Sequence, residues 1–131
     1  MKEAATEFHP KTWGSELWLV NSPKYCGKIM TVLQGKHCSV HYHALKHEHF
    51  FILKGRVLLE YVEQKLPKKV PDRRIILQHW KKNVKKKIMR AGDVVEIPPY
   101  YLHRFTGLAI HNRLIEISTM HYEHDSHRII K

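Results

Sequence analysis

The amino-acid sequence predicts an all-β protein, built as a sandwich or barrel of short strands. Runs rich in β-branched and aromatic residues alternate with glycine and proline turn signals, at the roughly 8–12-residue spacing typical of such folds. No internal repeat and no amphipathic helix of useful length interrupts this pattern. With 131 residues, 43% of them hydrophobic, the chain has the size and composition of one domain with one core, residues 1–131.

Six runs are predicted strands, because each combines strand-forming residues with flanking turn residues. They span residues 28–33, 37–44, 49–53, 56–63, 93–97 and 113–119. Lys54 and Gly55 separate two of these runs and predict a tight hairpin turn. The prolines of IPPYYLH, residues 97–103, predict an ordered loop that leads into a further strand at His103.

The net charge of +11 is concentrated in one segment. Residues 65–90 contain eleven lysines and arginines and one acid, whereas the rest of the chain holds twelve basic and eleven acidic residues. We interpret residues 64–87 as a basic variable insertion, mobile or loop-like, with a short strand or helical turn at most at residues 74–77. Contact with polyanions through residues 65–90, with Trp80 interleaved, is an alternative that we do not favour.

Location and redox state follow from what the sequence lacks. No stretch approaches the roughly 20 apolar residues of a membrane span, and the N-terminus lacks the apolar segment of a secretory signal. We therefore expect a cytoplasmic protein without a membrane partner. Cys26 and Cys38 are too few for a disulfide framework, so we expect both to be reduced and structural.

Histidines gather in the stretch VHYHALKHEHFFILKG, residues 40–55. Because side chains alternate along a strand, His41 and His43 share one face, with Cα atoms about 7 Å apart. Two neighbouring imidazoles on one face are suited to bind a single metal ion as adjacent ligands. Cys38 falls on the opposite face and is therefore not a predicted ligand.

The following strand adds a carboxylate. A turn at residues 44–46 is expected to return the chain antiparallel, and if Glu48 faces inward it joins the two imidazoles. His47 and His49 then point away from the site. Two further residues, on the same face as the glutamate, are expected to form its apolar walls: Phe50 and Ile52.

A fourth ligand is expected from another part of the chain, and His103, after the proline-stiffened loop, is the candidate. Imidazoles with a carboxylate suit a divalent ion such as Zn, Mn, Fe, Ni or Co. The alternative is that these are surface histidines in a chain that has twelve of them.

These residues resemble the two motifs of the cupin superfamily. Gly35, His41, His43, Glu48 and Gly55 are similar to the first motif at every signature position and spacing.

The second motif is matched in part. Gly92, Pro98 and His103 stand at its positions, but Tyr100 and Gly107 replace the glycine and asparagine that it expects. The metal-binding histidine is kept, so these departures concern the shape of the loop.

Within the superfamily, the chain is similar to the phosphomannose-isomerase-type cupins over residues 11–63 and 88–131. The stretches TWGSELWLV and EISTMHYEHDSHRIIK carry this likeness. It implies a jelly-roll barrel, also called a double-stranded β-helix, with a divalent metal in the barrel mouth and frequent homodimers.

The resemblance favours a metal-dependent isomerase that acts on a sugar or sugar phosphate, similar to mannose-6-phosphate isomerase. Such an enzyme needs a base that moves a proton between adjacent carbons. Candidates are Glu16, Lys28, Tyr100 and His121, although plain strand packing is the alternative for Glu16. A substrate phosphate also needs nearby cations, for which the candidates are Lys28, Arg104 and Arg113.

Two other functions are compatible with the same motifs: a non-catalytic protein that binds a sugar or nucleotide sugar, and an iron-dependent dioxygenase. Among the remaining residues, Trp13 and Trp18 are expected on the barrel exterior or at a dimer contact. Asp125 and Arg128 are expected to pair with each other or with a neighbouring subunit.

Overall fold

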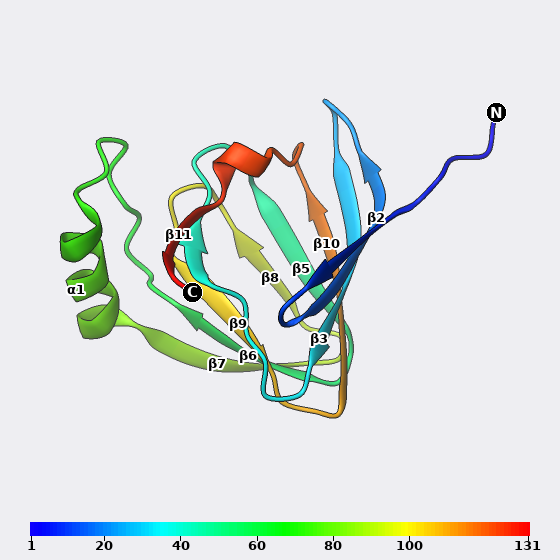
Figure 1. Ribbon diagram of the computed structural model, residues 1–131. Coiled ribbons are helices and arrows are strands. Elements are labelled where there is room, and N and C mark those ends of the chain that lie inside the picture. Colours follow the sequence, from blue (N-terminus) through cyan, green and yellow to red (C-terminus); the bar gives the residue numbers. More distant parts are fainter.

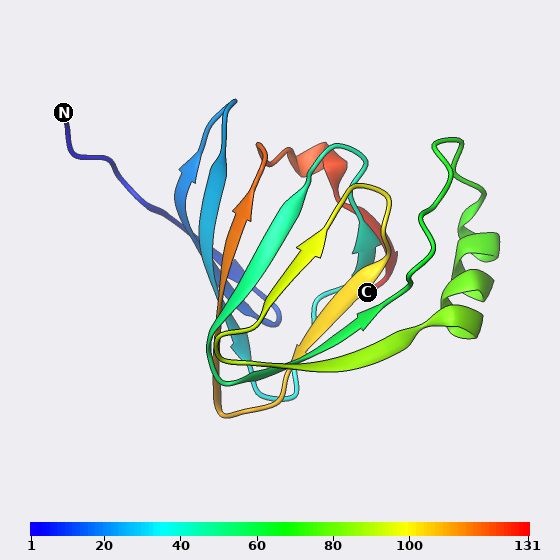
Figure 2. The ribbon, with the colours of Figure 1, turned by 180° about the vertical axis from the view of Figure 1, so that it is seen from behind.

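The computed structural model describes residues 1–131 as eleven strands, one α-helix and one short 3₁₀ helix (Figure 1). The strands form two antiparallel sheets that face each other without closing into a barrel (Figures 1 and 2). This confirms the predicted all-β, jelly-roll class. The six-stranded sheet has the order β1 (Glu7–Lys11), β2 (Gly14–Asn21), β3 (Cys26–Leu33), β10 (His111–Ser118), β5 (Glu48–Lys54), β8 (Val94–Ile97). The five-stranded sheet has the order β11 (His127–Ile130), β4 (Val40–Tyr42), β9 (His103–Gly107), β6 (Arg56–Tyr61), β7 (Lys85–Arg90).

The space between the sheets is apolar at one end and polar at the other. Strand alternation turns one set of side chains inward. On β10 these are Asn112, Leu114, Glu116 and Ser118, all of them buried. The apolar end is a cluster of twelve residues drawn from both sheets: Trp13, Met30, Val32, Cys38, Phe50, Ile52, Val57, Leu59, Met89, Ile97, Phe105 and Leu114.

Six of the strands coincide with the predicted runs, but the connections between them differ. The prediction of a hairpin at Lys54 and Gly55 was wrong, because β5 and β6 belong to different sheets and Gly55 turns the chain from one sheet to the other. For the same reason β4 and β5 are not antiparallel partners. From β3 to β6 the chain alternates between the two sheets, and a glycine at such a corner has the same local signature as a hairpin turn.

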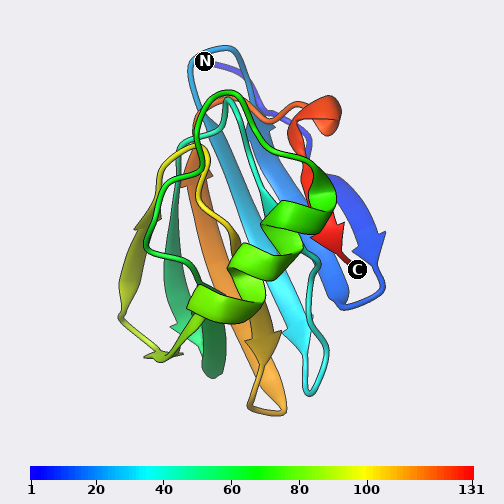
Figure 3. The ribbon, with the colours of Figure 1, turned by 90° about the vertical axis from the view of Figure 1, so that its left-hand side faces the viewer.

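Residues 64–72 form a loop, as predicted, but residues 73–87 fold into a helix and the start of β7, which corrects the prediction that they are loop-like or mobile beyond a short turn. Helix α1 (Arg73–Asn83) begins at the N-cap Asp72, whose carboxylate accepts a 3.1 Å hydrogen bond from the Ile75 amide. Four residues apart, Ile76 and Trp80 form a buried face. The helix crosses the outer side of the five-stranded sheet (Figure 3).

This second core explains why the helix forms. The outward side chains of β4 and the inner face of α1 pack together in one cluster of eight: Val40, Tyr42, Val62, Leu66, Ile76, Trp80, Leu102 and Ile129. After the helix, β7 pairs with β6 as the edge strand of its sheet, with Met89 buried and its other side chains exposed. The 11-residue helix does not meet the length and apolar character needed to cross a bilayer.

The expectation for Trp13 was also wrong. Its side chain is 8% exposed and meets the Phe105 ring edge-on, with ring centroids 5.9 Å apart. Trp13 therefore belongs to the main core rather than to the exterior of the barrel.

Gly55 generates a stability prediction. Its φ of 86° lies in the left-handed region, and an added Cβ would stand 2.2 Å from the His111 carbonyl oxygen and 2.4 Å from Asn112 Oδ1. We expect Gly55→Ala to lower the free energy of unfolding by about 3 kcal/mol or more, since backbone strain and a steric clash add. Urea-induced unfolding measures the change.

Gly92 provides the matched control. Its φ of 95° is similar, but nothing lies within 4 Å of an added Cβ. We expect Gly92→Ala to cost only the backbone strain of about 1–2 kcal/mol. Equal losses in the two variants would contradict the proposed clash at the sheet corner.

Candidate metal centre

Three histidines converge between the sheets at their polar end. His41 on β4 and His103 on β9 are direct partners in the ladder, and His43 follows β4. One ring nitrogen from each of the three lies within 4.8 Å of the others. The structure thus brings together the pair predicted from strand alternation and the candidate from the second motif.

Backbone carbonyls fix the orientation of all three rings. The Nδ1 atom of each imidazole lies at hydrogen-bond distance from a carbonyl oxygen, which only accepts, so Nδ1 carries the proton. The carbonyls belong to Ser39 for His41 (2.8 Å), Asp125 for His43 (2.9 Å) and Tyr101 for His103 (2.9 Å). In a neutral ring this leaves Nε2 with a free lone pair, the arrangement found in metal-binding histidines.

Burial keeps two of these rings neutral. It lowers the pKa of His41 well below its usual value, an effect to which positive charge on His103 or His43 would add. Burial also lowers the pKa of His43 to about 4, although Glu48 opposes the shift. At neutral pH His41 and His43 therefore present lone pairs rather than positive charge.

Glu48 reaches the same point from β5 in the opposite sheet. Its Oε2 lies 3.3 Å from His103 Nε2 and 3.5 Å from His43 Nε2. Both Glu48 Oε2 and His103 Nε2 are buried and form no properly aligned hydrogen bond, although they are close in distance. Burial alone would raise the pKa of Glu48, but Lys46 and the nearby histidines outweigh it and hold the pKa well below its usual range.

These atoms fit a divalent metal ion. Buried polar atoms without a partner are rare in folded proteins, and here two of them, Glu48 Oε2 and His103 Nε2, lie side by side. A cation would satisfy all of them together. Three imidazoles and one carboxylate form a donor set suited to Zn, Mn, Fe, Ni or Co.

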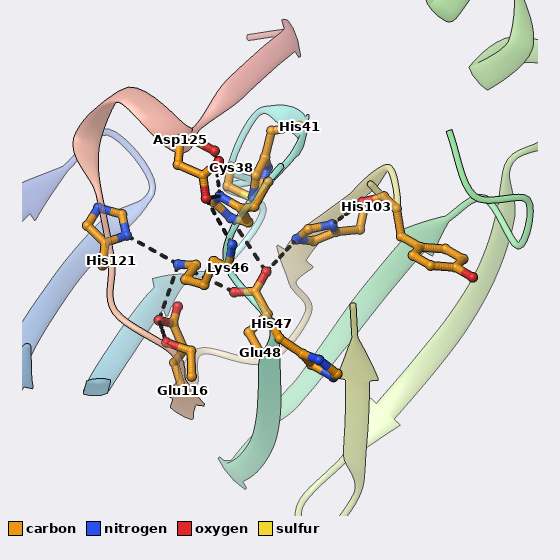
Figure 4. A network of polar contacts seen from close by, with 12 residues as sticks. Cys38, His41, Lys46, His47, Glu48, His103, Glu116, His121 and Asp125 are labelled. Atoms are coloured by element: carbon orange, nitrogen blue, oxygen red, sulfur yellow. Dashed lines mark hydrogen bonds and ion pairs between the residues drawn. The ribbon is translucent and has the colours of Figure 1, made fainter. Parts of the chain in front are cut away.

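A network of buried charges surrounds Glu48, and sequence reasoning missed part of it. Lys46 Nζ lies 3.5 Å from Glu48 Oε1, 3.3 Å from Glu116 Oε2 and 3.3 Å from His121 Nδ1 (Figure 4). Burial would lower the pKa of Lys46, but Glu48 and Glu116 together raise it. The ammonium group therefore stays charged and balances the carboxylates. The sequence did offer one sign of this network: Glu116 lies two positions after the apolar Leu114, so strand alternation turns both to the same inward face.

Asp125 is the other residue that the sequence did not explain. Its buried carboxylate accepts backbone hydrogen bonds of 2.8–3.1 Å from residues 44–46, and its carbonyl oxygen holds His43. The predicted pairing of Asp125 with Arg128 was wrong, since the carboxylate is occupied by this turn. Asp125 thus shapes the loop that carries Lys46.

Three of the four predicted catalytic residues line the same cavity as His41, His43 and Glu48. This cavity has a volume of about 490 Å³. Its charged and polar lining includes Glu16, Lys28, His41, His43, Lys46, Glu48, Glu116 and His121. Tyr100 lies elsewhere: it packs with the second core, its ring 6.1 Å from that of Tyr42.

Glu16 and Lys28 form a pair on the cavity wall. Lys28 Nζ is buried, lies 3.3 Å from Glu16 Oε1, and stands 4.4 Å from the centre of the Trp18 ring. Burial would raise the pKa of Glu16, but Lys28 and a 2.9 Å hydrogen bond from Trp18 outweigh it and lower the pKa. Trp18 therefore lies beside the cavity, which corrects its expected place on the exterior.

The other predicted cations lie outside the cavity. Arg104 alternates with His103 along β9 and pairs with Glu60 at 3.0 Å, and Arg113 is exposed on β10. Strand alternation turns both side chains away from the inward set.

Several smaller predictions are confirmed. His47 and His49 point away from the site, with 42% and 47% of their side chains exposed. Phe50 and Ile52 are buried on the same face as Glu48, but only Phe50 lines the cavity, and Ile52 lies deeper in the main core. Both cysteines are free and buried.

Comparison with known proteins identifies the fold. The sequence matches no protein-family model and no curated protein. The capsular polysaccharide assembling protein CapF from Staphylococcus aureus superposes with a TM-score of 0.73 at 14% identity, covering 98% of this chain and 33% of CapF. The chain thus spans about a third of the length of that protein.

Two further similar structures are covered over more of their own length than CapF is. L-ribose isomerase from Cellulomonas parahominis gives a TM-score of 0.73 at 19% identity, covering 88% of this chain and 69% of its own. KdgF from Halomonas sp. gives 0.68 at 11% identity, with 90% and 89% covered. All three are cupin-fold proteins, and identities this low establish the fold of this chain alone: a cupin-type jelly roll.

His121 generates a prediction on pH. Burial, with the positive charges of Lys28 and Lys46, lowers its pKa to about 4, and the nearby carboxylates offset only part of this shift. An unfolded histidine has a pKa of about 6.5. Between these values only the unfolded chain binds the proton, so the contribution of His121 to stability is present above pH 6.5 and is lost as the pH falls towards 4.

The variant His121→Gln removes this titration. From pH 7.5 to 4.5 we expect the wild type to lose about 1–2 kcal/mol more unfolding free energy than the variant does. Urea titrations at the two pH values measure the difference. The control is His111→Gln, which replaces an exposed histidine. It should lose as much unfolding free energy between the two pH values as the wild type does. An unchanged pH dependence in His121→Gln would contradict the prediction.

Proposed function

We propose that this protein binds a divalent metal ion through His41, His43, His103 and Glu48 and isomerises a sugar or sugar phosphate. The observation that carries the proposal is the buried carboxylate oxygen of Glu48 among imidazole nitrogens oriented by backbone carbonyls. The site opens on a cavity of about 490 Å³, a volume within the range of small-molecule sites. Likeness to an L-ribose isomerase supports the substrate class.

A bound divalent ion in such a site supplies Lewis-acid polarisation of a carbonyl oxygen. The protein must then move a proton between neighbouring carbons. Glu16 suits the role of base because it is ionised, lies on the cavity wall and is held in place by Lys28 and Trp18. His121 is the rival, since it is neutral at pH 7 and its Nδ1 faces Lys46.

Cations around the cavity support a substrate that carries a phosphate, as the likeness to phosphomannose-isomerase-type cupins suggests. Lys28 and Lys46 lie inside, each paired with a carboxylate. Further basic residues on the lining have no carboxylate partner within 4 Å: Lys11, Arg128 and Lys131. We propose that these three bind the phosphate and leave the inner lysines to order the proton-transfer groups.

Metal analysis and turnover test the proposal together. We expect the purified protein, loaded with Zn²⁺ or Mn²⁺, to hold one tightly bound ion in the cavity and to interconvert aldose and ketose phosphates. His43→Ala and His103→Ala should bind the ion about 100-fold more weakly. Glu16→Gln should keep the ion and lose turnover by about 100-fold or more. His111→Ala, an exposed histidine, is the control and should behave as wild type.

The outcomes separate the competing functions. Unchanged metal affinity of the cavity in His43→Ala would overturn the site itself. Sugar binding without turnover, detected as a rise in melting temperature, would favour a non-catalytic protein. Oxygen consumption by the Fe²⁺-loaded protein would favour a dioxygenase.

We also propose a homodimer that forms through the outer face of the six-stranded sheet. Direct cross-strand partners make an apolar row over five strands: Leu17, Ile29, Ile115, Phe51 and Val94. Beside this row Ile117 is 60% exposed. A flat apolar row can pack against its own copy around a twofold axis, which buries it on both subunits.

Light scattering coupled to size exclusion tests this surface. We expect a mass of two chains for the wild type and of one chain for Phe51→Glu and Ile115→Glu, because a charge in the row is unpaired in the dimer. A charge placed on the other sheet, in Ile88→Glu, should leave the dimer intact. A wild type that runs as one chain at micromolar concentration would overturn the proposal.

A further inference from the structure

A second cluster of ligating side chains lies on the outer face of the six-stranded sheet, opposite the metal centre. His47 immediately precedes β5 and His49 lies within it, so both project to the side that Glu48 avoids. Glu96 on β8 is the direct cross-strand partner of His49. Two imidazoles and one carboxylate from neighbouring strands therefore lie close together on this face.

The three ligand atoms are already close. His47 Nε2 lies 2.8 Å and His49 Nε2 3.8 Å from Glu96 Oε2, and all three atoms lie within 4.8 Å of one another. The two imidazole rings are nearly parallel, at 3°, with centroids 5.9 Å apart. The ladder between β5 and β8 holds this spacing, so little rearrangement is needed to bind an ion.

The surroundings provide no competing cation. Glu96 forms ion pairs with the two histidines and with no lysine or arginine. Its neighbours along the outer face are apolar: Ile117 beside His49, and Val94 two positions before Glu96 on β8. No lysine or arginine therefore competes with a metal ion for this carboxylate.

We propose that His47, His49 and Glu96 form a surface site for a divalent transition-metal ion. Two imidazoles and a carboxylate favour Zn²⁺, Ni²⁺ or Cu²⁺ over Mg²⁺ or Ca²⁺, which prefer oxygen ligands alone. About half of each side chain is exposed, so the remaining coordination positions face solvent. This site shares no ligand with the cavity and stands independently of the proposed active site. It borders the apolar row of the proposed dimer at Ile117 and Val94.

Equilibrium dialysis of the full chain against Zn²⁺, with Ni²⁺ as a second probe, tests the site. We expect the wild type to bind two ions, His43→Ala to keep the surface ion, and His49→Ala or Glu96→Gln to keep only the cavity ion. The loss should exceed about tenfold in affinity for each removed ligand. His49 and Glu96 are exposed, so both variants should melt at the wild-type temperature without metal.

His111→Ala is the matched control, because His111 is also an exposed histidine on this sheet but has no ligand neighbour. It should bind as many ions as the wild type. NMR spectra should show ring resonances of His47 and His49 shifting with Zn²⁺ in His43→Ala. The surface site would be overturned if the surface ion persisted in both His49→Ala and Glu96→Gln, or if it were absent from His43→Ala. Retention of the cavity ion in His43→Ala bears only on the proposed function.

Discussion

The fold is organised around one buried carboxylate. Glu48 is held between two sheets, with imidazoles on one side and an ammonium group on the other, and almost none of it reaches solvent. A charge in such a place is tolerated only when compensating groups are fixed around it. The backbone carbonyls that hold the three histidines, and the turn that Asp125 stabilises, can be understood as that compensation.

The same constraint explains the division of the interior. Alternate inward positions along β3, β5 and β10 change from apolar to charged at the polar end, where Lys28, Glu48 and Glu116 are all buried. The apolar half provides the burial that stabilises the sandwich. The polar half gives up part of that burial and gains a cavity whose walls carry both signs of charge.

The sequence was sufficient to predict those features that depend on local alternation. The shared face of His41 and His43, and that of Glu48 and Phe50, follow from a two-residue period, whatever the partner strands. Lys46 was not predictable in this way, because a carboxylate from Asp125, almost eighty residues later, sets the shape of its turn. Helix α1 was missed because its buried face consists of Ile76 and Trp80, and both ends of the helix are basic.

The lysine-rich stretch has a consequence for solubility. As the last strand of its sheet, β7 leaves one row of amides and carbonyls without a strand partner, which is a template for intermolecular β-pairing. Lys85, Lys86, Lys87 and Arg90 place positive charge along that rim. Two such edges repel each other. These positive charges therefore oppose the pairing of β7 with β7 of a second copy.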